Sequence, residues 1–451
     1  MLPSTIARKI KRRPSDFESI NNLTLTIRKN TRTTLKNIIF LASMFMASLI
    51  NFRKYVPILF LLLCSTLHAS FIEQTIGTAV VKDATAVYFN PSALTISPHQ
   101  QFILLGTLAR AQFEFNGSAQ KIPFGGSESG STLTKSNFFL PSMYLSIPIN
   151  EKFVMGFAVV ANDFNRELDN QPILRYILAR NQTNNIDFIP ALGIKINPFF
   201  SIGGNLNFTY AHLIQEPIAA GIPRLNIPES HSLNDSKANS LGGDFGILIK
   251  PGKRTALGVN YRSAVTYHLQ GSSSITGLQS ISSKDYHFKY WTPARSVMTL
   301  SHFFNEKIGF VGTVQYLQWN IFKEVSVYNF ATQASSKVFI VPRALIDYHL
   351  HNSWLLTLGT IYNVSPKWVF RVAGTYNQSP SNGRFQIGPG DSLITGFSMG
   401  YRLMTYLTVD CGYAHAFYRK EPIDILTSQN IITGSNEGYH DAVSLKFTLT
   451  A

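Results

Sequence analysis

Charged residues are scarce in this chain. Asp, Glu, Lys and Arg together make up 14% of its 451 residues, against roughly 25% in soluble globular proteins. Aromatic residues are frequent, at 12%. A soluble enzyme of this length normally carries more charge, whereas a membrane β-barrel needs less, because a wide outer band of its wall faces lipid. The composition therefore favours a membrane barrel over a soluble enzyme.

Cysteine is nearly absent. Of the two cysteines, Cys64 lies in a segment that we expect to be removed, and Cys411 would then be alone. The mature chain can therefore form no intramolecular disulfide. We interpret Cys411 as a small apolar side chain in a strand.

A concentrated basic surface is also missing, although the formal net charge is +15. Residues 1–69 hold eleven of the 40 basic residues and two of the 25 acidic ones, which leaves 29 basic and 23 acidic residues for the rest of the chain. So mild an excess gives no basic stripe of the kind that binds nucleic acid. No nucleic-acid partner is expected.

Long apolar runs are absent after residue 69. A transmembrane helix needs about 20 apolar residues, so the pattern excludes a helical membrane protein. Residues 53–69 are typical of a secretory signal peptide: Arg53 and Lys54 precede an apolar stretch at 56–63, and a cleavage sequence ends at Ala69.

Residues 1–52 combine a basic, polar stretch with a second apolar run at 38–50. Two interpretations stay open. The segment is either an extended targeting or anchoring sequence, or it lies upstream of the true start codon, at Met44 or Met46.

Beyond residue 100, residue types alternate along the chain. In 407–414, larger apolar side chains occupy the odd positions, while Thr, Asp, Gly and Ala occupy the even ones. The stretches 254–268 and 394–402 repeat this pattern. A period of two predicts strands with two unlike faces. An apolar face opposed to a face of glycine and polar residues suits lipid outside and a polar lumen inside.

The connections between the expected strands alternate in length. Short turns such as Asn150-Glu151 and Ser365-Pro366 alternate with long loops such as 116–136 and 332–350. An even strand count with this sorting is typical of outer-membrane barrels, which must close because an open sheet edge cannot face hydrocarbon. We therefore predict an all-β fold, a transmembrane antiparallel β-barrel of about 14 strands in residues 100–451. The expected strands lie near 101–115, 137–149, 152–163, 186–197, 199–213, 240–250, 254–268, 285–303, 307–331 (one strand or two), 352–363, 367–377, 392–403, 406–418 and 438–449.

The segment 70–99 does not alternate, and Asn90-Pro91 in it is a turn signal. These residues precede the first strand of the barrel, so their position relative to the barrel has to be inferred separately. They form either a periplasmic tail or a plug in the lumen, which a barrel of this size can hold.

The stretch from Asp83 to Thr95 resembles the hatch motif of the FadL-type fatty-acid and hydrocarbon transporters of the bacterial outer membrane (OMPP1/FadL/TodX). The motif begins with an acidic residue, Ala and Ser or Thr, and after four variable residues continues with Asn-Pro-Ala, a variable residue, a hydrophobic residue and Thr. This chain follows it except that Ser92 replaces the alanine. Further similarities keep the family's order and extend the resemblance over roughly 70–420; they lie at 140–144, 189–193, 257–263, 319–323 and 373–380.

The resemblance implies that residues 70–99 form a hatch in the lumen, with Asn90, Pro91 and Ser92 as its motif. It also implies passive transport of a hydrophobic compound, with long-chain fatty acid as the expected cargo. The ligand would be captured among the extracellular loops, the hatch would move, and the ligand would leave through the barrel wall. Uptake of aromatic or aliphatic hydrocarbons stays open as an alternative, and so does a general porin or an adhesin.

Three residues are candidate ligand contacts. Arg175 and Tyr176 lie in an apolar patch of the long loop 164–185, where members of the family often carry an Arg-Tyr pair, and Arg262 faces inward by alternation. A fatty-acid carboxylate requires a cation inside an apolar pocket, and an exposed apolar patch marks a binding surface. Two alternatives remain: the loops pack on each other as a lid, and Arg262 forms a salt bridge in the lumen.

No enzymatic activity, cofactor or metal is expected. The G-x-S-x-G match at 396–400 would need a strand, a sharp turn and a helix, but it lies in an alternating strand. The resemblance places the chain in the outer membrane of a Gram-negative bacterium. Outer-membrane lipid, lipopolysaccharide and the barrel assembly machinery are the further partners expected, and a monomer is the expected form.

Overall fold

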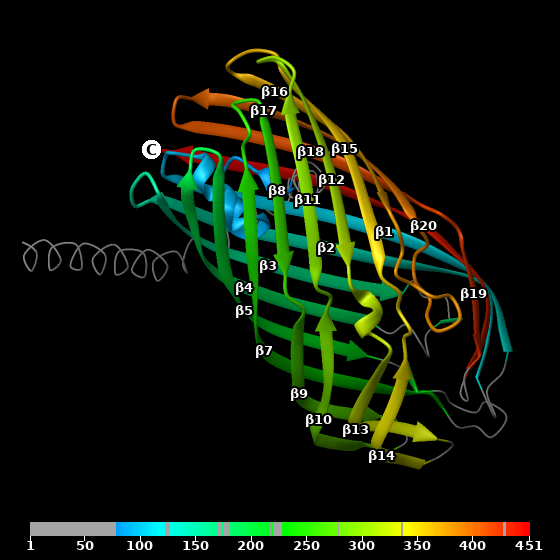
Figure 1. Cartoon of the computed structure of the whole chain (residues 1–451). Coiled ribbons are helices and arrows are strands. Elements are labelled where there is room, and N and C mark those ends of the chain that lie inside the picture. Colours follow the sequence, from blue (N-terminus) through cyan, green and yellow to red (C-terminus); the bar gives the residue numbers. More distant parts are fainter. Residues whose placement is uncertain are drawn as a thin grey trace, which may run out of the picture. The chain divides into compact units, whose positions relative to one another are not determined.

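The described residues form one closed β-barrel in the computed structural model (Figure 1). The structure describes residues 78–121, 127–168, 173–174, 180–216, 218–219, 228–277, 279–334, 337–426 and 430–451. One antiparallel sheet holds 20 strand segments. Strand β1 (Gln101–Lys121) pairs with β2 (Ser127–Pro148) on one side and with β20 (Asn430–Thr450) on the other, which closes the sheet.

The segments occupy fourteen positions around the barrel, because six positions hold two segments each. The prediction of an antiparallel barrel of 14 strands is therefore confirmed. The remaining segments are β3 (Phe153–Leu168), β4 (Arg180–Asn197), β5 (Phe200–Glu216) with β6 (Ile218–Ala219), β7 (Ser230–Ile249), β8 (Thr255–Arg262) with β9 (Val265–Thr276), β10 (Ile281–Thr292) with β11 (Arg295–Phe303), β12 (Ile308–Leu317) with β13 (Glu324–Ala334), β14 (Lys337–Asp347) with β15 (Ser353–Asn363), β16 (Trp368–Asn377), β17 (Ser392–Met404), and β18 (Leu407–Tyr418) with β19 (Glu421–Leu426).

Four consecutive wall positions are broken, at 263–264, 293–294, 318–323 and 348–352. On one side of the breaks β8 pairs with β11, and on the other β9 pairs with β10. Pro293 lies in one break, and a proline has no backbone N–H to continue the ladder. The pairing of β10 with β13 is reduced to two residue pairs. The wall on this side therefore bends instead of running straight.

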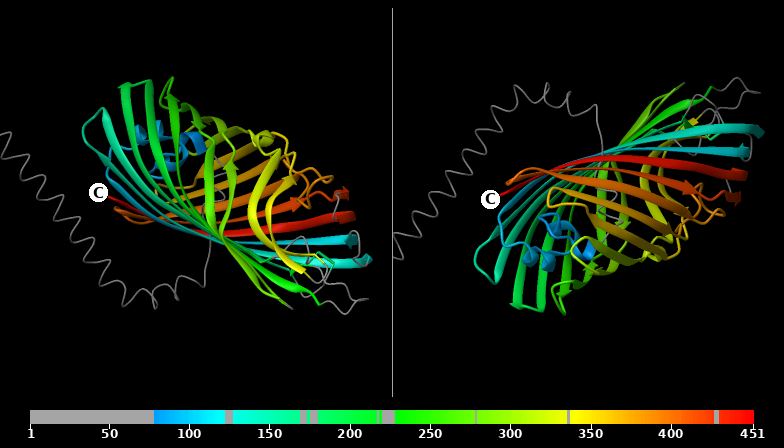
Figure 2. Two further views of the ribbon diagram at one scale, coloured as in Figure 1. Left: turned by 90° about the horizontal axis from the view of Figure 1, so that it is seen from below. Right: turned by 90° about the horizontal axis from the view of Figure 1, so that it is seen from above.

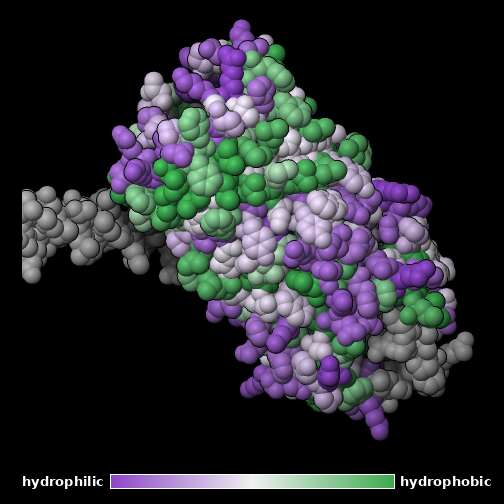
Figure 3. All heavy atoms as spheres, viewed as in Figure 1, coloured by the Kyte–Doolittle hydropathy of each residue, from purple (hydrophilic) through white to green (hydrophobic). Residues whose placement is uncertain are grey.

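The breaks coincide with a change in the outer surface. On the side of β8, β11 and β15, outward side chains such as Tyr261, Met298 and Leu358 are large, apolar or aromatic, and exposed. On the other side of the breaks, the outward side chains of β9 are polar, for example His268 and Gln270. Figure 3 shows the same division, with a hydrophobic area over β8, β11 and β12 and a largely hydrophilic area over β9, β10, β13 and β14. The apolar band is the lipid-facing surface that the alternation predicts.

The N-terminal segment, Thr78–Ile96, lies inside the barrel near the end that carries the short turns (Figure 2). It consists of η1 (Thr78–Val80), α3 (Ala86–Phe89) and η2 (Pro91–Ile96). Val87 and Leu94 pack with the inward side chains of Ile103, Tyr144 and Ile189 in one buried cluster. In the described part of the chain, no helix is both long and apolar enough to cross a membrane.

Several strand limits differ from the sequence prediction. The expected loop 332–350 contains β14, and β1 and β2 continue into the expected loop 116–136. The region 307–331 forms two segments, β12 and β13, with η4 (Trp319–Ile321) between them. Beyond the lipid band the outward face need not be apolar, so alternation no longer marks a strand. Cys411 lies in β18 as expected and is a free thiol, while residues 1–69 and Cys64 lie outside the described residues.

Candidate functional site

Asn90 fastens the N-terminal segment to itself and to the wall. Its Nδ2 donates hydrogen bonds to the Ala79 carbonyl at 2.7 Å and to the Ile247 carbonyl of β7 at 3.3 Å. Its Oδ1 accepts from the Ser92 amide and from the Ser92 hydroxyl at 2.7 Å. Pro91 begins η2, where its fixed φ suits a helical turn. The structure therefore brings Asn90, Pro91 and Ser92 together in one fully buried unit.

Glycines in the wall allow this close approach. A Cβ built on Gly246 would stand 1.8 Å from Asn90 Oδ1, and one on Gly203 would stand 2.4 Å from the Pro91 carbonyl carbon. A Cβ on Gly258 would stand 1.8 Å from the Ala79 carbonyl oxygen. Since no side chain fits at such distances, the segment rests directly on the backbone of the wall. Alternation places these glycines on the lumen face, but sequence reasoning did not link them to the hatch motif.

Arg262 is a second fastening point. Its Nε and Nη2 donate to the two carboxylate oxygens of Asp244 at 2.8 Å each, and Nη2 also donates to the Tyr88 carbonyl at 2.7 Å. The guanidinium lies 4.1 Å from the centre of the Tyr88 ring. Asn205 donates from Nδ2 to Asp244 and to the Val87 carbonyl. Of the two interpretations of Arg262, a ligand contact and a salt bridge in the lumen, this structure contains the salt bridge.

Asp83 ties the start of the segment to the last strand of the barrel. Lys446 of β20 donates to Asp83 at 3.0 Å and lies 3.8 Å from Asp410, which also accepts from Arg371 at 2.9 Å. Burial acts to raise the pKa of Asp83, but the Lys446 charge and hydrogen bonds from Thr85 outweigh it and hold that pKa below its usual value. The carboxylate is therefore ionised at neutral pH, and the ion pair persists there.

Arg175 and Tyr176 lie outside the described residues. Their loop neighbours Ile173 and Leu174 are buried, and they pack with Phe115, Ile425 and other side chains at the long-loop end of the barrel. The apolar patch of this loop is thus partly covered by the barrel's own strands.

An aromatic and aliphatic surface lines the lumen beyond the N-terminal segment. Tyr267 and Leu269 of β9, Tyr286 and Phe288 of β10 and Val327 of β13 belong to one buried cluster, which we call the lumen cluster. Beside it, Phe322 fills the break between β12 and β13, with aromatic rings of Tyr290, Trp291 and Tyr348 at 5.2, 5.7 and 6.3 Å. The alternation Tyr286, Phe288, Tyr290 was a usable signal for this surface, which sequence reasoning missed.

Arg295 stands between the lumen cluster and the N-terminal segment. It begins β11 directly after the Pro293 break, and it pairs in register with Arg262 of β8. By strand alternation its side chain lies on the same, inward face as Thr299. The Thr299 hydroxyl accepts a hydrogen bond from the Ala79 amide. Within the described ranges Arg295 forms no ion pair, and its Nε and both polar side-chain atoms of Asn260 are buried without a hydrogen-bond partner. Such groups are costly unless a ligand or water serves them, so this place suits an anionic head group.

The pairing of the wall has gaps beside the N-terminal segment. Between β2 and β3 the register passes from Phe139–Asp163 to Ser142–Val160, so that 140–141 and 161–162 stay unpaired. Gly156 of β3, a few residues further along, lies so close to Val87 that a Cβ there would come within 2.4 Å. The ladder of backbone hydrogen bonds between β2 and β3 is therefore interrupted here.

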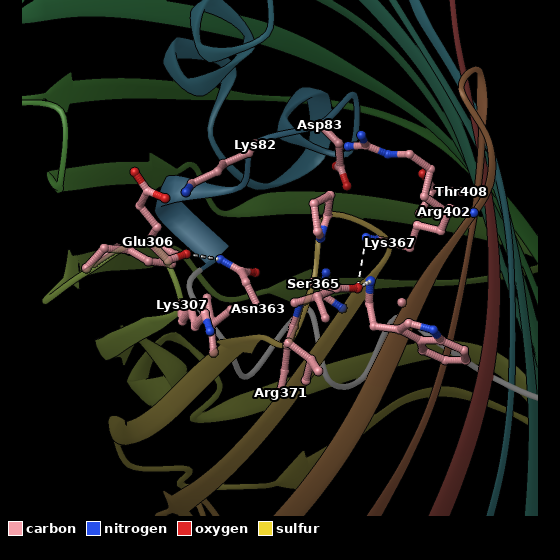
Figure 4. A pocket seen from close by; sticks show the side chains of 18 of the residues that line it. Lys82, Asp83, Glu306, Lys307, Asn363, Ser365, Lys367, Arg371, Arg402 and Thr408 are labelled. Atoms are coloured by element: carbon pink, nitrogen blue, oxygen red, sulfur yellow. Dashed lines mark hydrogen bonds between the residues drawn. The ribbon is translucent and has the colours of Figure 1, made fainter.

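A cavity of about 810 Å³ lies at the other side of the N-terminal segment, toward the short turns (Figure 4). Val80 to Asp83 form one wall of it, and strands β11, β12, β15 to β18 and β20 contribute the rest. Basic residues outnumber acidic ones in its lining. Arg402, which falls on the glycine and polar face of the alternating stretch 394–402, is among them.

No hydrolase geometry accompanies the G-x-S-x-G match. Ser398 lies in the middle of β17, which continues as a strand to Met404 and is followed by β18. The nucleophile turn between a strand and a helix is therefore missing there. Glu324, Asp347 and His349 come within 4.8 Å of one another, but all three are exposed.

Comparison with known proteins adds to this geometry. Residues 76–451 match a family model described as outer membrane protein transport protein (OMPP1/FadL/TodX). The chain is 20% identical to outer membrane protein P1 of Haemophilus influenzae over 381 residues, which are 75% of this chain and 81% of that protein.

Solved structures share the fold. The crystal structure of a Pseudomonas aeruginosa FadL homologue superposes with a TM-score of 0.71 at 18% identity, covering 83% of this chain and 96% of that one. The crystal structure of the Ralstonia pickettii toluene transporter TbuX superposes with a TM-score of 0.60 at 13% identity, covering 84% and 97%.

Proposed function

The chain belongs to the outer membrane transport protein family (OMPP1/FadL/TodX) and is an outer-membrane channel for hydrophobic compounds, not an enzyme; we propose that its cargo is long-chain fatty acid. Arg295, a lumen cation that forms no ion pair within the described residues, supports this choice. A fatty acid has one charged end and a long apolar tail, so it needs a cation next to an apolar surface. Arg295 and the lumen cluster provide these two surfaces on successive strands, β11 and β10.

The carboxylate of the bound fatty acid accepts hydrogen bonds from Arg295 Nε and from the amide of Asn260, which have no hydrogen-bond partner within the described residues. The tail lies along the lumen cluster, where burial of apolar surface stabilises it. A neutral hydrocarbon would use the cluster but not the cation. The resemblance to a toluene transporter therefore makes aromatic hydrocarbon the rival cargo, and the charge requirement separates the two.

The N-terminal segment acts as the hatch in this proposal. It closes the lumen below Arg295, and polar contacts through Asp83, Asn90 and Arg262 hold it. When the hatch shifts, the ligand leaves through the weakly paired wall of β2 and β3 into the membrane. No energy source is required, because binding and removal set the direction. The barrel works as a monomer inserted by the barrel assembly machinery, in contact with lipid and lipopolysaccharide.

Asn90→Ala should abolish this transport. The change removes four hydrogen bonds, each worth about 0.5–1.5 kcal/mol, and the hatch no longer holds its place under the ligand. We expect oleate uptake to fall by more than about tenfold, the factor that each 1.4 kcal/mol represents. The measurement is uptake of labelled oleate by cells that lack their own fatty-acid porter, with the outer-membrane level of the chain checked in parallel.

Asn90→Asp is the matched variant. It keeps the oxygen that Ser92 uses but loses the amide that binds Ala79 and Ile247, so its uptake should lie between those of wild type and alanine. If wild type inserts correctly and takes up no oleate, the fatty-acid assignment is wrong. If Asn90→Ala transports as well as wild type, the hatch role of this motif is wrong.

A further inference from the structure

The cavity on the short-turn side of the hatch carries more positive charge than the structure neutralises. Six basic and two acidic side chains line it; they are Lys82, Lys307, Lys367, Arg371, Arg402 and Lys446, with Asp83 and Glu306. Lys446 pairs with Asp83, and Arg371 pairs with Asp410 behind the lining. Four cations then face the single carboxylate of Glu306. None of the four forms an ion pair within the ranges that the structure describes.

These cations come from both sides of one space. Figure 4 shows Lys82 reaching in from the N-terminal segment, while Lys307, Lys367, Arg371 and Arg402 reach in from the wall and its turns. Lys307 and Lys367 stand in the two turns between β11 and β12 and between β15 and β16. Like charges that converge in this way repel one another. The side chains of all four cations that face Glu306 are exposed, so solvent screens this repulsion, and an anion between them would reduce it further.

The surroundings of Lys82 show the effect of this excess positive charge. Its ammonium lies 4.3 Å from the centre of the Phe303 ring, a contact that compensates part of its lost hydration. Burial against the cavity wall and the nearby charge of Arg371 lower the pKa of Lys82 below its usual value. A bound anion would oppose both effects.

Much of the remaining lining is apolar, beside the polar Ser301, Asn363, Ser365 and Thr408. Val81 of the hatch, Val311, Ile361 and Val369 of the wall and Val364 of a turn face the same space as the cations. The volume, about 810 Å³, falls in the range of roughly 300–1,000 Å³ usual for pockets that bind small molecules. A site for inorganic anions would not need this apolar surface, so the combination fits an amphiphile with one anionic end.

We propose that this cavity is a second binding site for the fatty carboxylate, on the periplasmic side of the hatch. Short turns face the periplasm in outer-membrane barrels, which fixes the side. The identity of the ligand rests on the proposed function, whereas the site itself rests on the cavity and its charges. Lys82 and Arg402 take the carboxylate, one from the hatch and one from β17, so that an occupied cavity would link hatch and wall.

The test uses the full-length chain purified in detergent and two photoreactive probes of equal chain length. One probe is a long-chain fatty acid with a diazirine close to its carboxyl group, and the other is the corresponding fatty alcohol. Cross-linked peptides are mapped by mass spectrometry. We expect the acid, but not the alcohol, to label peptides that contain 80–83, 361–371 or 400–408.

Lys82→Gln combined with Arg402→Gln should reduce this labelling by about tenfold or more, because two charge-assisted contacts are lost. The matched control is Lys152→Gln combined with Lys253→Gln, which removes two exposed lysines from short turns at the same end of the barrel. The control should label as wild type does. Gel mobility without heating checks that each variant forms a folded barrel.

Three outcomes would overturn the site: equal labelling by the alcohol, wild-type labelling of the Lys82/Arg402 variant, or stronger displacement of the acid probe by lysophosphatidylglycerol than by oleate. The last would assign the cavity to a phosphate head group of a lipid. Failure of the proposed function is measured separately. A chain that takes up no oleate but shows charge-dependent labelling keeps the site, and one that transports oleate without such labelling loses only the site.

Discussion

Arg262→Met is expected to release the hatch from the barrel wall. The guanidinium holds the buried carboxylate of Asp244 through two hydrogen bonds and the hatch through the Tyr88 carbonyl. Removing one partner of a buried ion pair leaves an uncompensated charge and costs about 3–5 kcal/mol. An energy of this size would raise the population of the released hatch by roughly a hundredfold or more. Trypsin cleavage after Lys82, measured on the detergent-solubilised chain, should accelerate accordingly.

A double variant separates release from general instability. Arg262→Met combined with Asp244→Leu removes both charges, so the stability of the barrel should largely return. The contact with Tyr88 stays lost in the double variant, so cleavage after Lys82 should stay faster than in wild type but slower than in Arg262→Met. If Arg262→Met leaves cleavage at the wild-type rate, this residue does not hold the hatch.

Arg295→Gln is expected to remove the preference for acids. A hydrogen bond to a charged group contributes about 1.5–3 kcal/mol, so binding of oleate should weaken by roughly ten- to hundredfold. Binding of oleyl alcohol should stay nearly unchanged, because the lumen cluster that takes the tail is untouched. Competition binding with both ligands on the purified chain measures the difference, and whole-cell uptake follows it at low oleate concentration.

Arg343→Gln serves as the control, because this arginine lies exposed on β14 outside the lumen. An equal loss of acid and alcohol binding in Arg295→Gln would mean that Arg295 shapes the lumen without contacting the carboxylate. Unchanged oleate binding would mean that the carboxylate does not contact Arg295. Aromatic hydrocarbon would then be the favoured cargo.

Much of the fold could be predicted, because the lipid-facing wall imposes a strict alternation. The strands β16, β17 and β18 lie within a few residues of their expected limits. The strand β14 was expected to be a loop, because its outer face lies beyond the lipid and carries charges such as Lys337 and Arg343. The break at Pro293 had a visible cause in the sequence, but the matching breaks in the neighbouring strands depend on pairing across the sheet.

The candidate site was only partly predictable. The run from Asp83 to Thr95 marked the hatch motif, and alternation placed Arg262 in the lumen. Neither could reveal that Arg262 forms an ion pair with Asp244, or that Arg295 forms no ion pair with any described residue. These facts depend on contacts between residues far apart in the chain. Arg175 and Tyr176 keep the status of a prediction.

The pairing of Asp83 with Lys446 has a consequence for biogenesis. Its two partners are separated by 363 residues, and Lys446 lies on the strand whose pairing with β1 completes the cylinder. The ion pair needs Lys446 in its final position, and Lys446 reaches that position only when β20 pairs with β1. This attachment of the N-terminal segment therefore depends on closure of the barrel, whereas the hydrogen bond from Asn90 to β7 and that from Arg262 of β8 to Tyr88 do not involve the last strand.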